Sequence, residues 1–253
     1  MIEFDIEGRI AVIRLDRVEA RNAINPEMAQ AIESAIDRLE QDDELWIGIL
    51  AHNGPVFSAG ADLKEIAAGN GAFLGTERGG FGGIVLRERT KPLIAAVDGH
   101  AVAGGTEIVL SCDLVVASTI AKFGIPEVKR SLVAAAGGLV RLPRGLPPNI
   151  AMELAITGDT LSAERAHHFG LVNELCPPGE VVAAATALAE RVAANAPIAV
   201  RESRRLILEA PTQTDSEGIV EGGRTIARLA STEDFAEGPR AFIEKRPPVW
   251  KGR

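Results

Sequence analysis

The chain has 253 residues, of which 46% are hydrophobic and 25% charged, and its formal net charge is −8. This is the composition of an ordinary globular protein, and the acidic balance disfavours nucleic acid or an anionic membrane as the main partner. The absence of tyrosine excludes tyrosine acid–base chemistry, and two cysteines are too few for a disulfide framework or a cysteine zinc site. The acidic residues 1–7 do not resemble a signal peptide, and no apolar run reaches the ~20 residues of a membrane span. We therefore expect a cytoplasmic enzyme or binding protein.

The first predicted elements are two alternating runs, 2–6 and 10–15, which indicate a β-hairpin around Glu7-Gly8-Arg9. Asn25 and Pro26 are a helix cap and a first helical residue, and apolar side chains recur at helical spacing over 26–40. Short apolar runs that read as buried strands follow, each with a loop and a helix-like stretch after it: 46–51, 92–97 and 114–117. Strand and helix alternating in this way predict an α/β fold with crossover connections.

The second half of the chain is mainly helical in pattern. The predicted helices are 151–156, 163–168, 181–194, 200–208, 219–229 and 234–244, with one strand-like run at 171–175. We interpret residues 1–190 as an α/β core and residues 191–253 as a helical region that packs on this core or on a neighbouring subunit. Residues 69–83 contain seven glycines and predict a mobile loop.

Two stretches after predicted strands contain small residues where a ligand could approach the backbone. In the first, Ser58 to Ala61 precede Asp62, which can cap a short helix and leave backbone amides free. An ordinary capped turn would have the same sequence. In the second, Gly104-Gly105 stand where a helix should begin, so their amides and the helix dipole favour a negative oxygen. Glu107 lies in that first turn, where it is also a common stabilising acid.

A third stretch, 123–129, places Glu127 twenty residues after Glu107 in an apolar setting. Two carboxylates that meet in one pocket can divide the acid and base roles if their surroundings separate their pKa values. Alone, Glu127 could equally be an ion-pair partner of Lys129 or Arg130. The chain has no His-Glu-x-x-His motif, no Gly-x-Ser-x-Gly elbow and no phosphate-binding glycine loop, and we expect no metal site.

Together, these stretches resemble the enoyl-CoA hydratase/isomerase (crotonase) family. The likeness rests on Ser-Ala-Gly-Ala-Asp-Leu at 58–63, Asp-Gly-x-Ala-x-x-Gly-Gly-x-Glu at 98–107 and Phe-Gly-x-Pro-Glu at 123–127, and it extends over nearly the whole chain. It implies a crotonase-like spiral of ββα units with a C-terminal helical oligomerisation region. It further implies an acyl-CoA substrate, no metal or redox cofactor, and a homotrimer or a hexamer made of two trimers.

Carried over by position, the resemblance assigns the catalytic roles. The oxyanion donors fall on the amides of Ala61 and Gly104, and the acid–base pair on Glu107 and Glu127. The residues implied in binding CoA and the acyl group are Arg21, Ala59, Gly60, Ala61, Asp62, Leu63, Gly104 and Lys245. Because both glutamates are present, the resemblance favours a 2-enoyl-CoA hydratase, with a double-bond isomerase and a non-catalytic CoA-binding scaffold as alternatives. Val18 and the Ser-Leu-Val-Ala-Ala-Ala-Gly-Gly run at 131–138 depart from the family pattern and leave the acyl substrate open.

Overall fold

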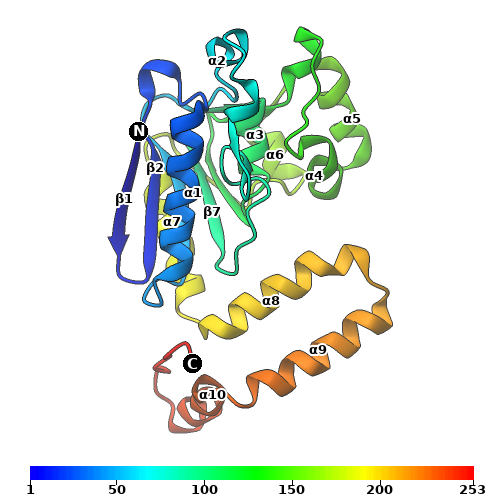
Figure 1. Ribbon diagram of the computed structural model, residues 1–253. Helices are drawn as coiled ribbons and strands as arrows, with labels where there is room; N and C mark the ends of the chain where they lie inside the picture. The colour runs from blue at the N-terminus through cyan, green and yellow to red at the C-terminus, as the bar shows by residue number, and fades with distance from the viewer.

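The computed structural model describes all residues, 1–253, as an α/β body from which a helical arm projects (Figure 1). The body is built on a six-stranded sheet in the order β1-β2-β3-β7-β9-β12. Its strands are β1 (Ile2–Glu7), β2 (Ile10–Leu15), β3 (Ile47–His52), β7 (Leu93–Val97), β9 (Leu114–Ser118) and β12 (Glu174–Cys176). Only β1 and β2 pair antiparallel, which confirms the predicted hairpin, and the other neighbours are parallel.

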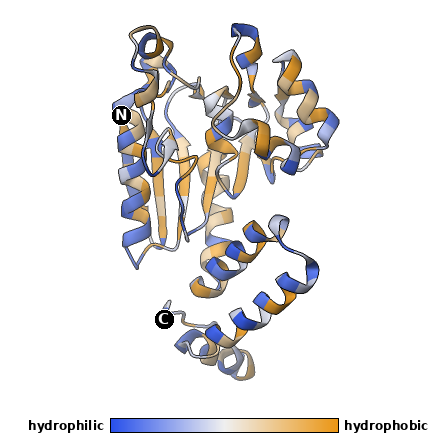
Figure 2. Ribbon diagram, turned by 45° about the vertical axis from the view of Figure 1, so that its right-hand side comes forward, coloured by the Kyte–Doolittle hydropathy of each residue, from blue (hydrophilic) through white to orange (hydrophobic).

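Two helices cover opposite faces of this sheet because the side chains of its strands alternate in direction. Helix α1 (Pro26–Gln41) packs on one face with Ile32 and Ile36, and the Asn25 side chain caps it by accepting from the Met28 amide at 2.9 Å. Helix α7 (Val181–Ala193) packs on the other face with Ala185 and Ala189. The strands between them are apolar, and the outer side of α1 is mainly hydrophilic (Figure 2).

A second sheet of very short strands, which the sequence did not predict, lies next to the carboxyl ends of β3 and β7. Its order is β11-β10-β8-β4, and its strands are β4 (Val56–Ser58), β8 (His100–Val102), β10 (Lys122–Gly124) and β11 (Thr160–Ser162). The chain leaves β3 for β4 and leaves β7 for β8, so the two glycine-containing stretches follow neighbouring strands of this second sheet.

Short elements complete the body. The helices are α2 (Leu63–Ala67), α3 (Gly104–Val109), α4 (Gly138–Gly145), α5 (Pro148–Thr157) and α6 (Ala163–His168), with single 3₁₀ turns η1 (Val18–Ala20), η2 (Gly71–Phe73) and η3 (Pro126–Arg130). The glycine-rich stretch 69–83, predicted as a mobile loop, contains η2 and a small antiparallel pair, β5 (Gly75–Thr76) and β6 (Gly80–Phe81). The predicted strand at 171–175 is found as β12, which starts three residues later, at Glu174, and ends at Cys176.

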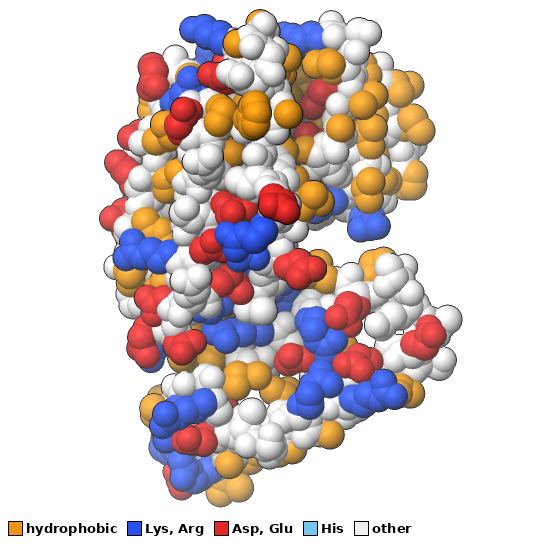
Figure 3. All heavy atoms as spheres, in the orientation of Figure 1, with side chains coloured by type: hydrophobic (Ala, Val, Ile, Leu, Met, Phe, Trp, Pro, Cys, Tyr) orange, Lys and Arg blue, Asp and Glu red, His pale blue; other side chains and the backbone are white.

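The arm consists of α8 (Pro197–Glu209), η4 (Ala210–Thr212), α9 (Asp215–Leu229) and α10 (Glu233–Glu244). It begins after α7 ends at Ala193, so the predicted division at 190/191 falls inside the last turn of α7. Arg204 on α8 fastens the arm to the body: its Nε donates to Asp113 at 2.9 Å and its Nη1 to the carbonyl of Arg89 at 2.6 Å. An open notch separates the rest of the arm from the upper body (Figure 3). No helix combines the length and apolar character that crossing a membrane needs.

Candidate active site

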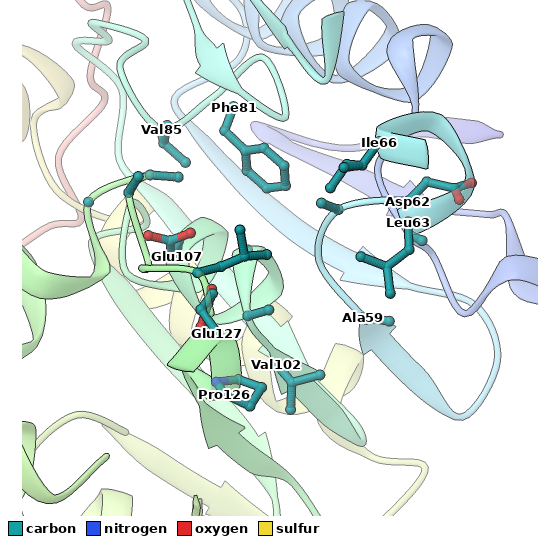
Figure 4. Close-up of a pocket in the computed structure, with 18 of the residues that line it drawn as sticks. Ala59, Asp62, Leu63, Ile66, Phe81, Val85, Val102, Glu107, Pro126 and Glu127 are labelled. Carbon is teal, nitrogen blue, oxygen red and sulfur yellow. The ribbon is translucent and has the colours of Figure 1, made fainter. Parts of the chain in front are cut away.

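A cavity of ≈ 1220 Å³ lies where the segment after β4, the start of α3, η3 and the segment leading into α4 meet. Figure 4 shows two of its sides: Ala59 and Leu63 on one, and Glu107 and Glu127 on the other. The cavity lining is mainly hydrophobic with a few charged side chains, which is the usual character of a small-molecule site. Its lining residues run from Arg17 to Arg144, so distant parts of the chain form one cavity.

The first wall is the loop of residues 58–62, and buried hydrogen bonds fix it. The Ser58 hydroxyl donates to the carbonyl of Asn22 at 2.8 Å and accepts from the amide of Gly60 at 3.1 Å. Ile24 bonds the backbone on both sides of Ala61, accepting from Asp62 N at 2.9 Å and donating to Gly60 O at 2.8 Å. The Ala61 amide between these two bonds donates to no protein acceptor and is therefore free for a ligand.

The second wall is the entry to α3. Ala103 adopts φ 52° and ψ −131°, a strained conformation for a residue with a side chain, and it directs the chain into the helix at Gly104. The Gly104 amide, the first of the helix, has no protein acceptor. The two loops touch, since a methyl group added to Gly60 would lie 2.8 Å from Gly104 N. The two free amides therefore belong to adjoining loops.

Glu107 lies on α3 and is only 3% exposed. Burial raises its pKa, and the backbone amides of Gly138 and Ala136, followed by the Arg141 charge, oppose that rise. The bond from the Gly138 amide to Glu107 Oε1 is 2.9 Å long. Glu107 therefore has donors that stabilise its ionised form, even though burial disfavours the charge.

Glu127 stands in η3, half-buried on the same side of the cavity as Glu107 (Figure 4). Burial raises its pKa, its own backbone amide opposes the rise, and the neighbouring charge of Glu107 adds to it. Its Oε2 atom is buried and has no hydrogen-bond partner. The two carboxylates therefore differ: Glu107 accepts from amides of a separate segment, 136–138, whereas Glu127 has its own amide and an unpartnered buried oxygen, which favours the protonated acid.

Most of the residues predicted for the site line this one cavity: Arg21, Ala59, Ala61, Asp62, Leu63, Gly104, Glu107 and Glu127. Gly60 does not line it and is instead packed against Ala103 and Gly104. Asp62 caps α2 and pairs with Arg17 at 2.8 Å, so it fixes the loop. Lys245 is not brought to the cavity within this chain, because it caps the end of α10 in the arm. That expectation is not met by a single chain.

The structure adds two residues that sequence reasoning missed, Phe81 and Arg141. The Phe81 ring packs on Gly104, where an added methyl group would lie 2.3 Å from a ring carbon. Arg141 lies on α4, four residues after Gly137, in a stretch for which the sequence predicted no helix. No group of three or more His, Cys, Asp or Glu side chains is arranged to hold a metal ion.

Comparisons with known proteins show the family and the fold that the chain shares with them. A model of the enoyl-CoA hydratase/isomerase family matches residues 5–253. A carnitinyl-CoA dehydratase of Salmonella typhi is 39% identical over 252 residues, which cover 97% of this chain and 96% of that protein. The crystal structure of an enoyl-CoA hydratase from Mycobacterium tuberculosis H37Rv superposes with a TM-score of 0.96 at 45% identity, covering 100% of this chain and 99% of that one. A carnitinyl-CoA hydratase from Mycobacterium avium gives 0.79 at 42% identity, with 100% and 98% coverage. These matches confirm the predicted fold class.

Proposed function

The chain belongs to the enoyl-CoA hydratase/isomerase family, and on that premise we propose that it adds water reversibly to a 2-enoyl-CoA thioester to give a 3-hydroxyacyl-CoA. The observation that carries this proposal is the meeting of two free amides, at Ala61 and Gly104, with two dissimilar carboxylates in one cavity. An isomerase that moves a double bond needs only one carboxylate to carry its proton, so a pair favours hydration.

The amides are proposed to stabilise the charge that develops during the reaction. When water attacks C3 of the enoyl thioester, negative charge moves to the thioester oxygen and an enolate forms. Donors that are already fixed in place stabilise this oxygen without reorganisation, and losing one of them typically raises a barrier by about 3 kcal/mol. The bonds that Ser58 and Ile24 make on either side of Ala61 supply this fixed geometry.

The two glutamates are proposed to divide the proton transfers. Glu107 is stabilised as an anion by the Gly138 amide, so it takes a proton from the attacking water. Glu127 favours its protonated form and delivers a proton to C2 of the enolate. Dehydration reverses both transfers. Every charge and proton in this scheme is handled by the chain itself, so the proposal includes no metal or redox cofactor.

The CoA part is proposed to lie along Arg21 and the backbone of 59–63. Figure 4 shows Ala59 and Leu63 of this segment across the cavity from the glutamates. We further propose a homotrimer, alone or paired as a hexamer, formed through the arm. In the single chain, Phe242 is 85% exposed, Ile243 78% and Ile219 75%. A contact between subunits would bury these large apolar side chains. Lys245 closely follows Phe242 and Ile243 in the sequence. We therefore propose that it contacts the phosphates of a CoA bound in the cavity of a neighbouring subunit.

A second candidate is dehydration of carnitinyl-CoA, which the names of two relatives raise. The cavity offers little to the quaternary ammonium of such a substrate. Cations of this kind are recognised by aromatic cages, yet Phe81 is the sole aromatic lining residue. Arg130, Arg141 and Arg144 also line the cavity and form no ion pair. We therefore propose an acyl group without a positive charge.

Turnover assays test the proposal. The protein is incubated separately with a 2-enoyl-CoA series, a 3-enoyl-CoA and carnitinyl-CoA, and the conjugated thioester absorbance is followed. Hydration predicts its loss with 2-enoyl-CoA, whereas isomerisation predicts its appearance with 3-enoyl-CoA. Glu107→Gln and Glu127→Gln should each lower turnover at least about a hundredfold, with CoA-ester binding little changed. Near-normal rates in either variant would refute the assigned roles, and a protein that binds acyl-CoA without turnover would be a scaffold.

A further inference from the structure

Arg141 on α4 bridges two separate segments that line the cavity. Its Nη2 donates to the carbonyl of Val85 at 2.6 Å, and its Nη1 donates to the carbonyl of Ala136 at 3.4 Å. Both acceptors are neutral, and Arg141 forms no ion pair within the chain although its side chain is half-buried. A planar guanidinium can join two carbonyls in this way, whereas the single ammonium of lysine cannot reproduce its fork geometry.

The segment that Arg141 holds is the one that supplies the donors to Glu107. Gly137 packs directly under the guanidinium, so that an added methyl group would lie 2.4 Å from Nη1, and its φ of 106° requires glycine. Gly138, the next residue, donates its amide to Glu107 Oε1 at 2.9 Å. The guanidinium therefore fixes the position of residues 136–138, and these residues fix the Glu107 carboxylate.

The charged surroundings of this pair are few. Glu107 faces Arg141 on α4 and Glu127 in η3. Arg141 in turn faces Glu107, Arg144 on its own helix, Arg89, and the Cys112 thiol that follows α3. The burial of Cys112 raises its pKa to about 12, so this thiol is neutral at ordinary pH. Arg141 is thus the one positive charge directed at Glu107.

We propose that Arg141 is a positioning residue for the general base: it anchors 136–138 against residue 85 so that backbone amides face Glu107, and its charge keeps that carboxylate ionised. The inference rests on the proposed hydratase function, in which Glu107 must be an anion to accept a proton from water. Without the arginine, Glu107 would remain buried, lose part of its donor set and hold its proton to higher pH.

The test measures Glu107 itself as well as turnover. In protein labelled with ¹³C at the glutamate carboxyls, the Glu107 resonance, identified by its loss in Glu107→Gln, is titrated by NMR in the wild type and in Arg141→Gln, Arg141→Lys and Arg144→Gln. We expect Arg141→Gln to raise the titration midpoint by about 1 pH unit and Arg141→Lys to raise it less. The acid limb of kcat/KM should move upward with it. Arg144→Gln, which removes the same charge from the same helix, should leave the midpoint in place.

The results separate this inference from the proposed function. An unmoved midpoint in folded Arg141→Gln, or an equal shift in Arg144→Gln, would overturn the positioning role even if turnover fell. If Arg141→Gln does not fold, Arg141→Lys decides: an unmoved midpoint together with unchanged kcat would overturn the proposal, whereas reduced kcat with a small upward shift would support it. Because the NMR titration requires no turnover, a wild type inactive on every 2-enoyl-CoA would refute the hydratase and still leave the Glu107 midpoints measurable.

Discussion

Replacing Gly60 with alanine tests the contact between the two loops that carry the proposed oxyanion donors, residues 58–62 and the entry to α3 at Gly104. Gly60 has a φ of 84°, and an added methyl group would lie 2.8 Å from the Gly104 amide nitrogen and 2.9 Å from the Ala103 side chain. Both neighbours are held firmly, because the Ala103 amide bonds the carbonyl of Gly124 at 2.8 Å. The methyl group must therefore push the Gly104 amide away from the Ala61 amide.

Two effects of this substitution can be separated in magnitude. Left-handed backbone in alanine costs about 1–2 kcal/mol, and the steric overlap adds roughly 1–3 kcal/mol to the loss of folding stability. The catalytic effect is distinct: if the Gly104 donor is displaced, turnover should fall about 10²–10³-fold. Gly170→Ala is a matched control, because Gly170 has a φ of 87° and no atom within 4 Å of the added methyl group. The Gly170→Ala variant therefore has the cost of left-handed backbone in alanine but no steric overlap.

The assay compares kcat for 2-enoyl-CoA hydration and the thermal midpoint of both variants. Gly60→Ala should lose far more turnover than Gly170→Ala, while KM changes less than kcat because the donors act mainly in the transition state. If folded Gly60→Ala keeps the turnover of the control, the amide of Gly104 does not stabilise the reacting oxygen, and the oxyanion reasoning is wrong.

Three further predictions concern the supports of the site. Glu127→Gln should stabilise the fold by about 1 kcal/mol at pH 8 while abolishing turnover, since it replaces a buried, unpartnered carboxylate oxygen. Burial raises the Glu127 pKa in the folded state, so the contribution of Glu127 to stability is present at low pH and is lost as the pH rises through that pKa. In calorimetry the gain of the Glu127→Gln variant over the wild type should therefore vanish near pH 4, and an equal gain at pH 4 and pH 8 would contradict this cause. Ser58→Ala should cost about 1–3 kcal/mol in urea unfolding, because it leaves the amide of Gly60 without its buried acceptor, and it should also reduce turnover; a neutral effect on both would show that Ile24 alone fixes the loop. Arg204→Gln removes the bonds from α8 to the body, and amide hydrogen exchange in α8 should quicken roughly tenfold for about 1.4 kcal/mol of lost local stability, whereas unchanged exchange would mean that other contacts hold the arm.

The parts of the fold that could be predicted are those with a local cause. The α1 helix has its cap at Asn25, its proline at the first position and a regular apolar stripe, so it could be recognised from 16 consecutive residues. The strands of the large sheet are apolar runs bounded by turns. The three-residue strands of the small sheet have no periodicity to detect, and they exist because β4, β8, β10 and β11 pair with one another across the chain.

Helix α4 was missed for a different reason. It begins with glycine and contains Pro143, both of which disfavour a helix when judged locally. Leu142 is nevertheless buried in the main core, and burial there outweighs the propensity of the sequence. The position of Arg141 depends on this helix. Neither the helix nor the place of Arg141 beside Glu107 could therefore be derived from the sequence alone.

The motif residues of the site, by contrast, were predictable because each lies in a stretch whose local chemistry is distinctive. Asp62 caps a helix and Gly104 starts one, and these properties hold wherever the stretches are placed. Their convergence is tertiary and could be expected only from the family resemblance. For Lys245 the resemblance implied a role in CoA binding, but it did not say whether the CoA lies in the cavity of the same chain or of a neighbouring one.

The strain at Ala103 connects the fold to the chemistry. Its backbone conformation, φ 52° and ψ −131°, costs of the order of 1–3 kcal/mol for a residue with a side chain. Such strain persists only where surrounding bonds determine it, and here Thr106 contributes: its hydroxyl oxygen lies 2.6 Å from the carbonyl oxygen of Ala101 and 2.8 Å from that of Gly124, with one proton to donate, and it accepts from the Gly124 amide at 3.0 Å. The strained entry keeps the Gly104 amide free at the cavity, so the bonds that hold α3 to the small sheet are also what make the proposed oxyanion donor available.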